Sequence, residues 1–251
     1  MRIIENLSPR RPTHMPEYAE ACVRALVEQG LGDKISLPRT PLRGVGGALG
    51  LLHYLDYRPT HDVDAWWDAS ATSEERQRVI HTLETTLRSL GQVKTRAWGD
   101  GVSVELVRES KTVSSFQTCA EHGRSIAQRS AQLEPSNPLP WAEMRLDSFA
   151  DLVASKMVAW VERGAPRDFR DIYVLCQAAL ATPHQCWELW RRRQHLAGSD
   201  TDFLRARLAV ETHLARIAQH RRLDQIADPQ QQAEAERVRD WFASEFLNVP
   251  T

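Results

Sequence analysis

The sequence predicts an α+β protein in which helices flank a small mixed β-sheet and a helical domain follows. Before residue 135, short extended runs alternate with helical patterns, whereas nearly everything after that point has a helical pattern. The proline-rich run Pro135-Ser-Asn-Pro138-Leu-Pro140 separates these two parts. We therefore expect a core domain over residues 1–135 and a helical C-terminal domain over residues 136–251.

The spacing of apolar residues predicts two long helices in the core domain, besides a short helical pattern at residues 48–55. Residues 16–31 place Ala19, Cys22, Val23, Leu26 and Val27 on one face, and residues 73–90 form the second helix, with Ser73 as its N-cap. In the C-terminal domain, Thr182-Pro183 is expected to end one helix and Asp228-Pro229 to open the last one.

Four short extended runs are the predicted strands of the sheet, and they cover residues 42–45, 63–67, 93–98 and 102–107. The last two flank Gly99-Asp100-Gly101, which is a strong signal for a short hairpin.

Composition and charge limit the classes of protein to which the chain can belong. With 42% hydrophobic and 26% charged residues among 251, the chain is typical of globular proteins, and its apolar runs are shorter than the ~20 residues that span a membrane. It shows no signal-peptide core near the N-terminus and no Cys-x-x-Cys spacing, so we expect a reduced, cytoplasmic protein without a membrane role.

The net charge of −1 argues against a protein that grips a long nucleic-acid duplex, because such proteins carry a strong positive excess. Arginines nevertheless crowd the C-terminal third, at positions 191–193, 205, 207, 216, 221 and 222. Two interpretations stay open: a patch that meets an RNA end, or solvated helix faces with local acidic partners.

The most informative stretch is residues 44–64, where two adjacent glycines precede a pair of acids. In an extended Asp62-Val63-Asp64 triplet both carboxylates point to one face, and Mg²⁺ takes oxygen ligands of this kind. Gly46 and Gly47 let the backbone approach a ligand closely, next to a helical pattern that runs from residue 48 to 55. The combination predicts a metal site that handles phosphate; a tight turn followed by a solvated strand end is the alternative.

A third carboxylate is expected from the hairpin. Glu105 lies on the strand face opposite Val104 and Leu106, and it completes a cluster of three acids if its strand pairs near the Asp62–Asp64 strand. Asp100 in the turn is a rival ligand. We expect His53 and His61 to be structural, and Trp66 and Trp67 to belong to the core and its rim.

Two separate motifs in the sequence resemble a known family. Gly46-Gly47-Ala48-Leu49, followed by Arg58-x-Thr60-x-Asp62-Val63-Asp64, is similar to the signature of the nucleotidyltransferase fold, and more narrowly to AbiEii/AbiGii-type, or MenT-like, nucleotidyltransferase toxins. The second motif contains Lys156 and Arg163 and continues as Arg167-Asp168-Phe-Arg-Asp171. The resemblance covers roughly residues 40–180 and implies a nucleotidyltransferase-like core.

The resemblance implies a reaction that moves a nucleoside monophosphate from an NTP to an acceptor hydroxyl and releases pyrophosphate. The metal ligands would be Asp62, Asp64 and Glu105, holding two Mg²⁺ ions, with Mn²⁺ as an alternative. Lys156 would neutralise the triphosphate, and Asp168 would position the nucleophile or orient Lys156. The competing interpretation of this second motif is an interdomain ion-pair network of Lys156 with Asp168 or Asp171, with Arg167 taking part nearby.

The site residues implied by the resemblance also include four that would bind the nucleotide. Gly46 and Gly47 would lie against the phosphates, Thr60 would hold the loop, and Arg58 would offer its guanidinium to phosphate or to the acids. The implied acceptor is an RNA, such as a tRNA 3′ end, and the implied protein partner is a cognate antitoxin. A small-molecule or protein acceptor, and a nucleotide-binding or protein-interaction module without turnover, are the alternatives.

Overall fold

The computed structural model describes residues 7–13, 15, 17–31, 42–58, 60, 62–67, 71–99, 101–108, 111–119 and 133–249. For residues 17, 42–48, 62, 66, 108 and 111–119 the description covers the backbone only. The chain divides into two compact units between Leu152 and Val153, inside the helix α5 (Phe149–Arg163). The boundary expected after residue 135 stays a prediction.

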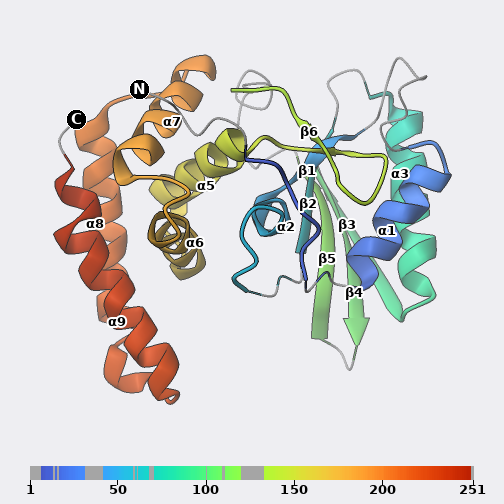
Figure 1. Cartoon of the computed structure of the whole chain (residues 1–251). Helices are drawn as coiled ribbons and strands as arrows, with labels where there is room; N and C mark the ends of the chain where they lie inside the picture. Colours follow the sequence, from blue (N-terminus) through green and yellow to red (C-terminus); the bar gives the residue numbers. More distant parts are fainter. Residues whose placement is uncertain are drawn as a thin grey trace. The chain divides into compact units, whose positions relative to one another are not determined.

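The N-terminal unit is built on a mixed seven-stranded sheet with the strand order β3-β4-β5-β2-β1-β7-β6 (Figure 1). The pairs β2–β5 and β1–β7 are parallel, and the other pairs are antiparallel. The strands are β1 (Leu42–Gly46), β2 (Asp62–Trp67), β3 (Gln92–Trp98), β4 (Gly101–Arg108), β5 (Lys111–Cys119), β6 (Asn137–Pro138) and β7 (Arg145–Leu146).

The four strands and the hairpin expected from the sequence are all present, to within one residue at each end. Gly99 forms the turn between β3 and β4 with a positive φ of 51°, as the hairpin signal predicts. The sequence did not reveal β5, although this strand lies in the middle of the sheet. Its residues are mostly Ser, Thr and Gln without a clear apolar alternation, so its place is set by pairing with β4 and β2.

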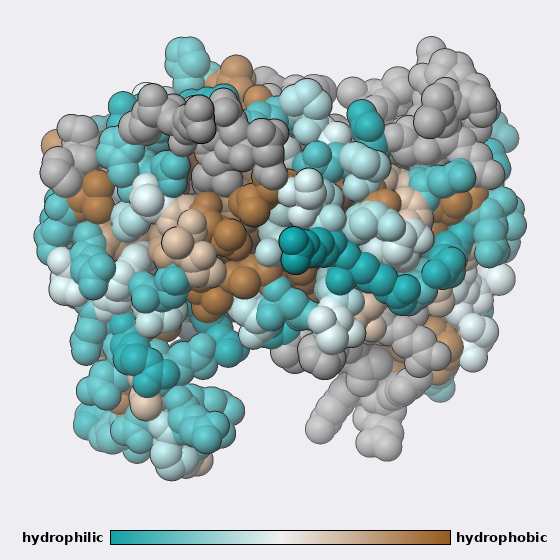
Figure 2. All heavy atoms as spheres, viewed as in Figure 1, coloured by the Kyte–Doolittle hydropathy of each residue, from teal (hydrophilic) through white to brown (hydrophobic). Residues whose placement is uncertain are grey.

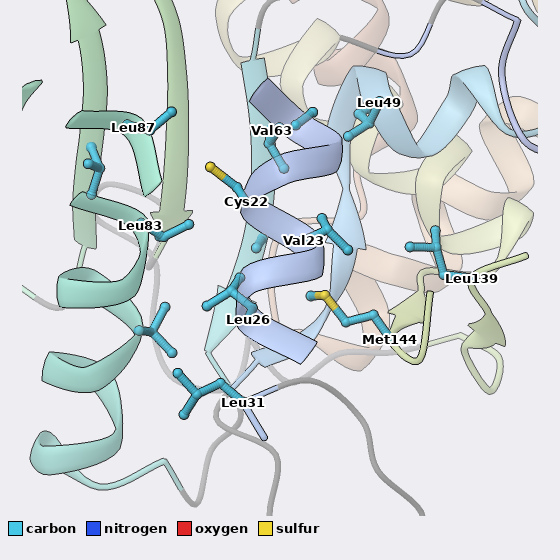
Figure 3. Close-up of a cluster of buried hydrophobic side chains, with 14 of the residues drawn as sticks. Cys22, Val23, Leu26, Leu31, Leu49, Val63, Leu83, Leu87, Leu139 and Met144 are labelled. Atoms are coloured by element: carbon cyan, nitrogen blue, oxygen red, sulfur yellow. The ribbon is translucent and has the colours of Figure 1, made fainter. Parts of the chain in front are cut away.

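Helices α1 (Glu17–Glu28) and α3 (Ser73–Arg88) supply the apolar side chains that cover one face of this sheet. Cys22, Val23 and Leu26 of α1 are completely buried and lie near Val63 of β2 (Figure 3). Leu83 of α3 packs into the same cluster. Residues 62 and 64, which alternate with the buried Val63, therefore belong to the opposite face of the sheet.

The start of α3 differs by one residue from the sequence prediction, because Thr72 rather than Ser73 is the N-cap. The Thr72 hydroxyl accepts a hydrogen bond from the Glu75 backbone N–H, and the Glu75 carboxylate accepts one from the Thr72 N–H at 2.7 Å. This reciprocal pair satisfies two N–H groups that the helix itself leaves without partners. Ser73 offers no such pairing with the residue three positions ahead of it, which is Arg76.

The C-terminal unit is helical, as the sequence predicts. After α5 it contains α6 (Pro166–Gln177), α7 (Pro183–Leu196), α8 (Phe203–His220) and α9 (Pro229–Ser244), together with the short 3₁₀ segments Leu223–Gln225 and Phe246–Asn248. Asp228 caps α9 as expected. Thr182-Pro183 does not end a helix but opens α7, because Thr182 and Gln185 form a capping box there.

An aromatic cluster holds this unit together around Trp160 of α5, which is completely buried. The ring centroid of Trp160 lies 5.4 Å from that of Phe169, 5.5 Å from that of Trp187, and 5.1 Å from those of Phe242 and Phe246. Since these rings come from α6, α7, α9 and the last 3₁₀ segment, the Trp160 side chain joins α5 to four other elements of this unit. Within the described part of the chain, no helix is both long and apolar enough to cross a membrane.

We predict that Gly164→Ala destabilises the C-terminal unit. Gly164 forms the turn between α5 and α6 with a φ of +55°, and a Cβ there would overlap the ring of His213, whose Nε2 lies 3.0 Å from the Val161 carbonyl. A positive φ costs an alanine about 1–2 kcal/mol, and overpacking costs about 1–3 kcal/mol more. Chemical denaturation measures the loss in the free energy of unfolding.

The matched control for this change is Gly198→Ala. Gly198 has nearly the same backbone conformation, with a φ of +62°, but a Cβ there meets no atom within 4 Å. It should therefore cost only the backbone part, about 1–2 kcal/mol. Equal losses in the two variants would show that the close approach of His213 to Gly164 does not constrain the turn.

Candidate active site

The two glycines of the first motif lie where a strand passes directly into a helix. Gly46 ends β1, and Gly47 begins the six-residue helix α2 (Gly47–Leu52). In the antiparallel pair β1–β2, Gly46 is the direct partner of Asp64. Because opposed residues in such a pair have Cα atoms about 4.5–5.5 Å apart, the fold brings the glycine backbone beside the second acid of the Asp-x-Asp triplet.

Asp62 and Asp64 share the face of β2 that points away from the apolar cluster. Val63 and Ala65, which alternate with them, are completely buried. The Asp64 side chain is half-buried, whereas the Asp62 side chain lies outside the described residues. The backbone thus places both acids on one face, as the sequence predicts, next to the strand-to-helix junction at Gly46 and Gly47.

Glu105 lies on this same face but on β4, which does not pair with β2. Strand β5 runs between them, and its residue 115 is the direct partner of both Asp62 and Glu105. The sequence predicted a cluster of three acids only if the strand of Glu105 paired near β2. In the structure β4 is separated from β2 by one strand, β5. Asp100, the rival ligand, lies outside the described residues.

The Glu105 carboxylate is nearly buried, with 9% of the residue exposed, and already has polar partners. Its Oε1 atom lies 3.3 Å from Nε of Arg96 and 3.5 Å from the Ser103 hydroxyl, which donates to it. Among the described side chains, no group of three or more His, Cys, Asp or Glu residues is arranged to hold a metal ion. Glu105 as a metal ligand stays a prediction.

Thr60, Arg58 and Trp67 lie close in the chain to the two acids. Thr60, two positions before β2, is buried, and the half-buried Arg58 places its guanidinium carbon 5.6 Å from the centre of the Tyr57 ring. Trp67 packs against the core, and Arg76 lies 5.4 Å from its ring centre, as expected for an aromatic residue at the rim. His61 and the Trp66 side chain lie outside the described residues.

His53 is structural, as expected. It is buried at the end of α2, where Nδ1 lies 2.8 Å from the Leu49 carbonyl and Nε2 accepts a hydrogen bond from the Trp141 indole at 3.0 Å. Burial lowers the pKa of His53. Because protonated Nε2 would face the Trp141 N–H, both contacts favour the neutral ring with its proton on Nδ1.

The second motif forms a buried ion-pair cluster between α5 and α6. Nζ of Lys156 lies 2.9 Å from Oδ2 of Asp171 and 3.4 Å from Oδ1 of Asp168. Both aspartates are completely buried, and only 7% of Lys156 is exposed. Charges at this depth need close partners, since an isolated one would be strongly destabilising.

Arg163, the last residue of α5, completes the cluster from the solvent side. Its Nε and Nη2 atoms donate to the two oxygens of Asp168 at 2.9 and 3.1 Å, in a bidentate arrangement. The expected participation of Arg167 is wrong: this residue is exposed and forms no ion pair with any other residue in the described part of the chain. The ion-pair interpretation of the second motif therefore describes contacts that are present, all of them within the C-terminal unit.

A polar site that sequence reasoning did not identify lies at the start of α5. The buried Asp151 carboxylate accepts hydrogen bonds from the backbone N–H groups of Leu133 and Glu134 at 2.9 and 3.1 Å and from the Ser148 hydroxyl at 2.7 Å. The Asp151 N–H in turn donates to the Ser148 hydroxyl. The Ser-x-x-Asp spacing just before an apolar run is a capping signal that could have revealed this site.

Four of the arginines in the C-terminal third are either paired with a nearby acid or buried. Arg205, Arg207 and Arg222 are each paired with an acid within five residues, namely Asp200, Glu211 and Asp224. Arg193 is buried. Figure 2 shows a mostly hydrophilic surface where α8 ends and α9 begins. These contacts favour solvated helix faces with local acidic partners over a dedicated RNA patch.

We predict that Lys156→Met lowers the free energy of unfolding by about 3–5 kcal/mol, because it leaves two buried carboxylates without the ammonium group between them. Chemical denaturation at neutral pH measures the change. The matched control is Arg163→Met: half of the Arg163 side chain is exposed, so its loss should cost clearly less. If Lys156→Met cost no more than Arg163→Met, the buried pair would not stabilise this unit.

The comparison with known protein families agrees with both motifs. The family described as nucleotidyl transferase AbiEii toxin, type IV TA system, matches residues 45–245, which covers well over half of the chain and includes the glycine junction, the Asp-x-Asp strand and the Lys156 cluster. No curated protein matches the chain. The match confirms the resemblance seen in the sequence, and the chain belongs to the AbiEii nucleotidyltransferase toxin family of type IV toxin–antitoxin systems.

Proposed function

We propose that this nucleotidyltransferase moves a nucleoside monophosphate from an NTP to an acceptor hydroxyl, releases pyrophosphate and depends on Mg²⁺. The observation that carries the proposal is the pairing of Gly46 with Asp64. It places a stretch of backbone without side chains beside two carboxylates that share one face of β2. A triphosphate requires both features, namely close approach to the backbone and oxygen ligands for its cations.

The residues present fit a hard divalent cation. Asp62 and Asp64 are paired on one strand face, and carboxylate oxygens are the ligands that Mg²⁺ prefers; Mn²⁺ accepts the same ligands. We propose these two acids as the main ligands and Glu105 as the third. When bound there, such ions lower the pKa of an attacking hydroxyl and neutralise charge on the phosphates. Since Glu105 is also paired with Arg96, its contribution requires sharing or releasing that contact.

The remaining site residues act on the triphosphate in this proposal. Gly46 and Gly47 present their backbone to the phosphates, Thr60 holds the loop that leads into β2, and Arg58 offers its guanidinium to the phosphates or to the acids. Lys156 neutralises the departing pyrophosphate, with Asp168 setting the direction of its ammonium group. The short contacts of Lys156 with Asp168 and Asp171 support an oriented ammonium.

For the acceptor we propose an RNA hydroxyl, such as that of a tRNA 3′ end, with a cognate antitoxin as the regulatory partner. The type IV toxin family supports an antitoxin. The net charge of −1 argues against binding along a duplex, and we therefore propose a short contact with the end of an RNA. A single hydroxyl at an exposed end needs only such a contact.

The test is incubation of the purified protein with Mg²⁺, each of the four labelled NTPs in turn, and total RNA. The expected result is label transferred to an RNA band in the presence of Mg²⁺ and no transfer when EDTA is present from the start. Label on the protein itself or on an added small-molecule alcohol would identify that molecule, and not RNA, as the acceptor. NTP binding without any transfer would contradict the proposal and indicate a nucleotide-binding module without turnover.

We predict that Asp62→Ala and Asp64→Ala each abolish transfer and leave the fold intact. Removing one carboxylate weakens cation binding and relieves repulsion between the two acids, so the melting temperature should hold or rise slightly. The control is Asp224→Ala, which removes an exposed carboxylate from the C-terminal unit and should keep full activity. Near wild-type turnover of either β2 variant at saturating Mg²⁺ would refute the metal assignment.

We predict separately that Glu105→Gln lowers the transfer rate by orders of magnitude while NTP still binds, because the amide keeps the size of the side chain and loses its charge. The control is Arg96→Met, which removes the ion partner of Glu105 but no proposed ligand, so it should affect the rate far less. If Asp100→Asn were the damaging change and Glu105→Gln silent, the third ligand would come from the β3–β4 turn.

A further inference from the structure

Two free cysteines face each other across the turn between α6 and α7. Cys176 lies in the last turn of α6 and Cys186 in the first turns of α7, and their sulfur atoms are 4.0 Å apart, within a thiol–thiol hydrogen bond. A disulfide needs the sulfurs about 2 Å apart, so bond formation requires the two thiols to approach by about a further 2 Å. The pair is thus reduced in this structure but placed for oxidation.

The backbone on both sides holds the two thiols in this arrangement. After Cys176, the Ala179 N–H donates to the Cys176 carbonyl at 3.0 Å. Before Cys186, Thr182 and Gln185 fix the start of α7 through their capping box, and the Cys186 N–H donates to the Thr182 carbonyl at 2.9 Å. The thiols therefore stay close without relying on a flexible loop, which raises the rate at which one can react with the other.

The two thiols differ in their access to solvent. Cys186 is completely buried, and its hydrogen bond with Cys176, together with burial, raises the pKa of its thiol well above the ordinary value. Cys176 is half-buried. An oxidant from solvent therefore reaches Cys176 first. Cys186 is shielded from solvent and remains a thiol at this stage.

We propose that Cys176 and Cys186 form a reversible oxidation site that a peroxide converts to a disulfide between α6 and α7. In the first step the Cys176 sulfur attacks hydrogen peroxide, becomes a sulfenic acid and releases one water. In the second, the Cys186 sulfur attacks that sulfenic acid, gives up its proton and releases a second water. Two thiols and one peroxide thus yield one disulfide and two waters.

Such a bond would covalently link α6, which carries Asp168 and Asp171, to α7. Cys22 provides an internal contrast, because it is completely buried in the N-terminal unit and burial raises the pKa of its thiol to about 12. We therefore expect oxidation at the α6–α7 pair and not at Cys22.

The experiment treats the full-length, reduced, folded chain with hydrogen peroxide in a Cys119→Ser background, which removes the one cysteine whose side chain is not described. Intact mass should fall by two hydrogen atoms, and non-reducing peptide mapping should find Cys176 linked to Cys186. Dithiothreitol should restore the original mass, and Cys22 should remain alkylatable after unfolding.

Two single variants separate the steps. In Cys186→Ala, dimedone should trap a sulfenic acid on Cys176; in Cys176→Ala, Cys186 should remain reduced under the same treatment. Circular dichroism checks that each variant is folded. If Cys186→Ala proves unstable, the variant at the half-buried Cys176 still tests whether Cys186 oxidises without Cys176. A chain that keeps both thiols, goes to sulfinic acid at Cys176 without a cross-link, or links either cysteine to Cys22 would overturn the proposal.

Discussion

The alternation of side chains along β2 is the constraint on which the candidate active site depends. Val63 and Ala65 are completely buried under α1, and this burial fixes which way every second residue of the strand points. A slip of one residue would bring Asp62 and Asp64 into the apolar cluster, at a cost far above the gain from any single contact. The same apolar packing that stabilises the N-terminal unit therefore keeps two repelling carboxylates together on the other face.

The position of β5 determines how the polar face of the sheet is organised. Because β5 lies between β2 and β4, Asp62 on β2 and Glu105 on β4 are both direct partners of its residue 115. Glu105 is meanwhile balanced by Arg96 and Ser103, so it is stable in this position without a bound cation. The sheet thus places two acids on one face of β2 and one separately neutralised acid on β4, which is a less uniform arrangement than a simple cluster of three.

The C-terminal unit combines an aromatic core with a buried ionic cluster. Trp160 joins four elements by ring contacts, and the tight turn at Gly164 brings α6 back along α5 so that Asp168 and Asp171 reach Lys156. A buried ion pair adds little stability compared with apolar packing, but it strongly disfavours arrangements that separate its members. The contacts of Lys156 in this structure are those of a buried ion-pair cluster, and its action on a triphosphate stays a prediction.

The sequence by itself determined the strand-and-glycine motif, the hairpin, the helical C-terminal half and the family, because these depend on local periodicity and on residues close together in the chain. Only the tertiary structure decided what depends on pairing between distant segments: the central place of β5, whose polar composition carries no apolar period, and the separation of Glu105 from β2. It also decided that Arg163, and not Arg167, holds Asp168, and that Thr182 opens a helix. Residue types and spacing show which groups can interact, whereas the folded backbone selects one partner among several candidates of the same charge.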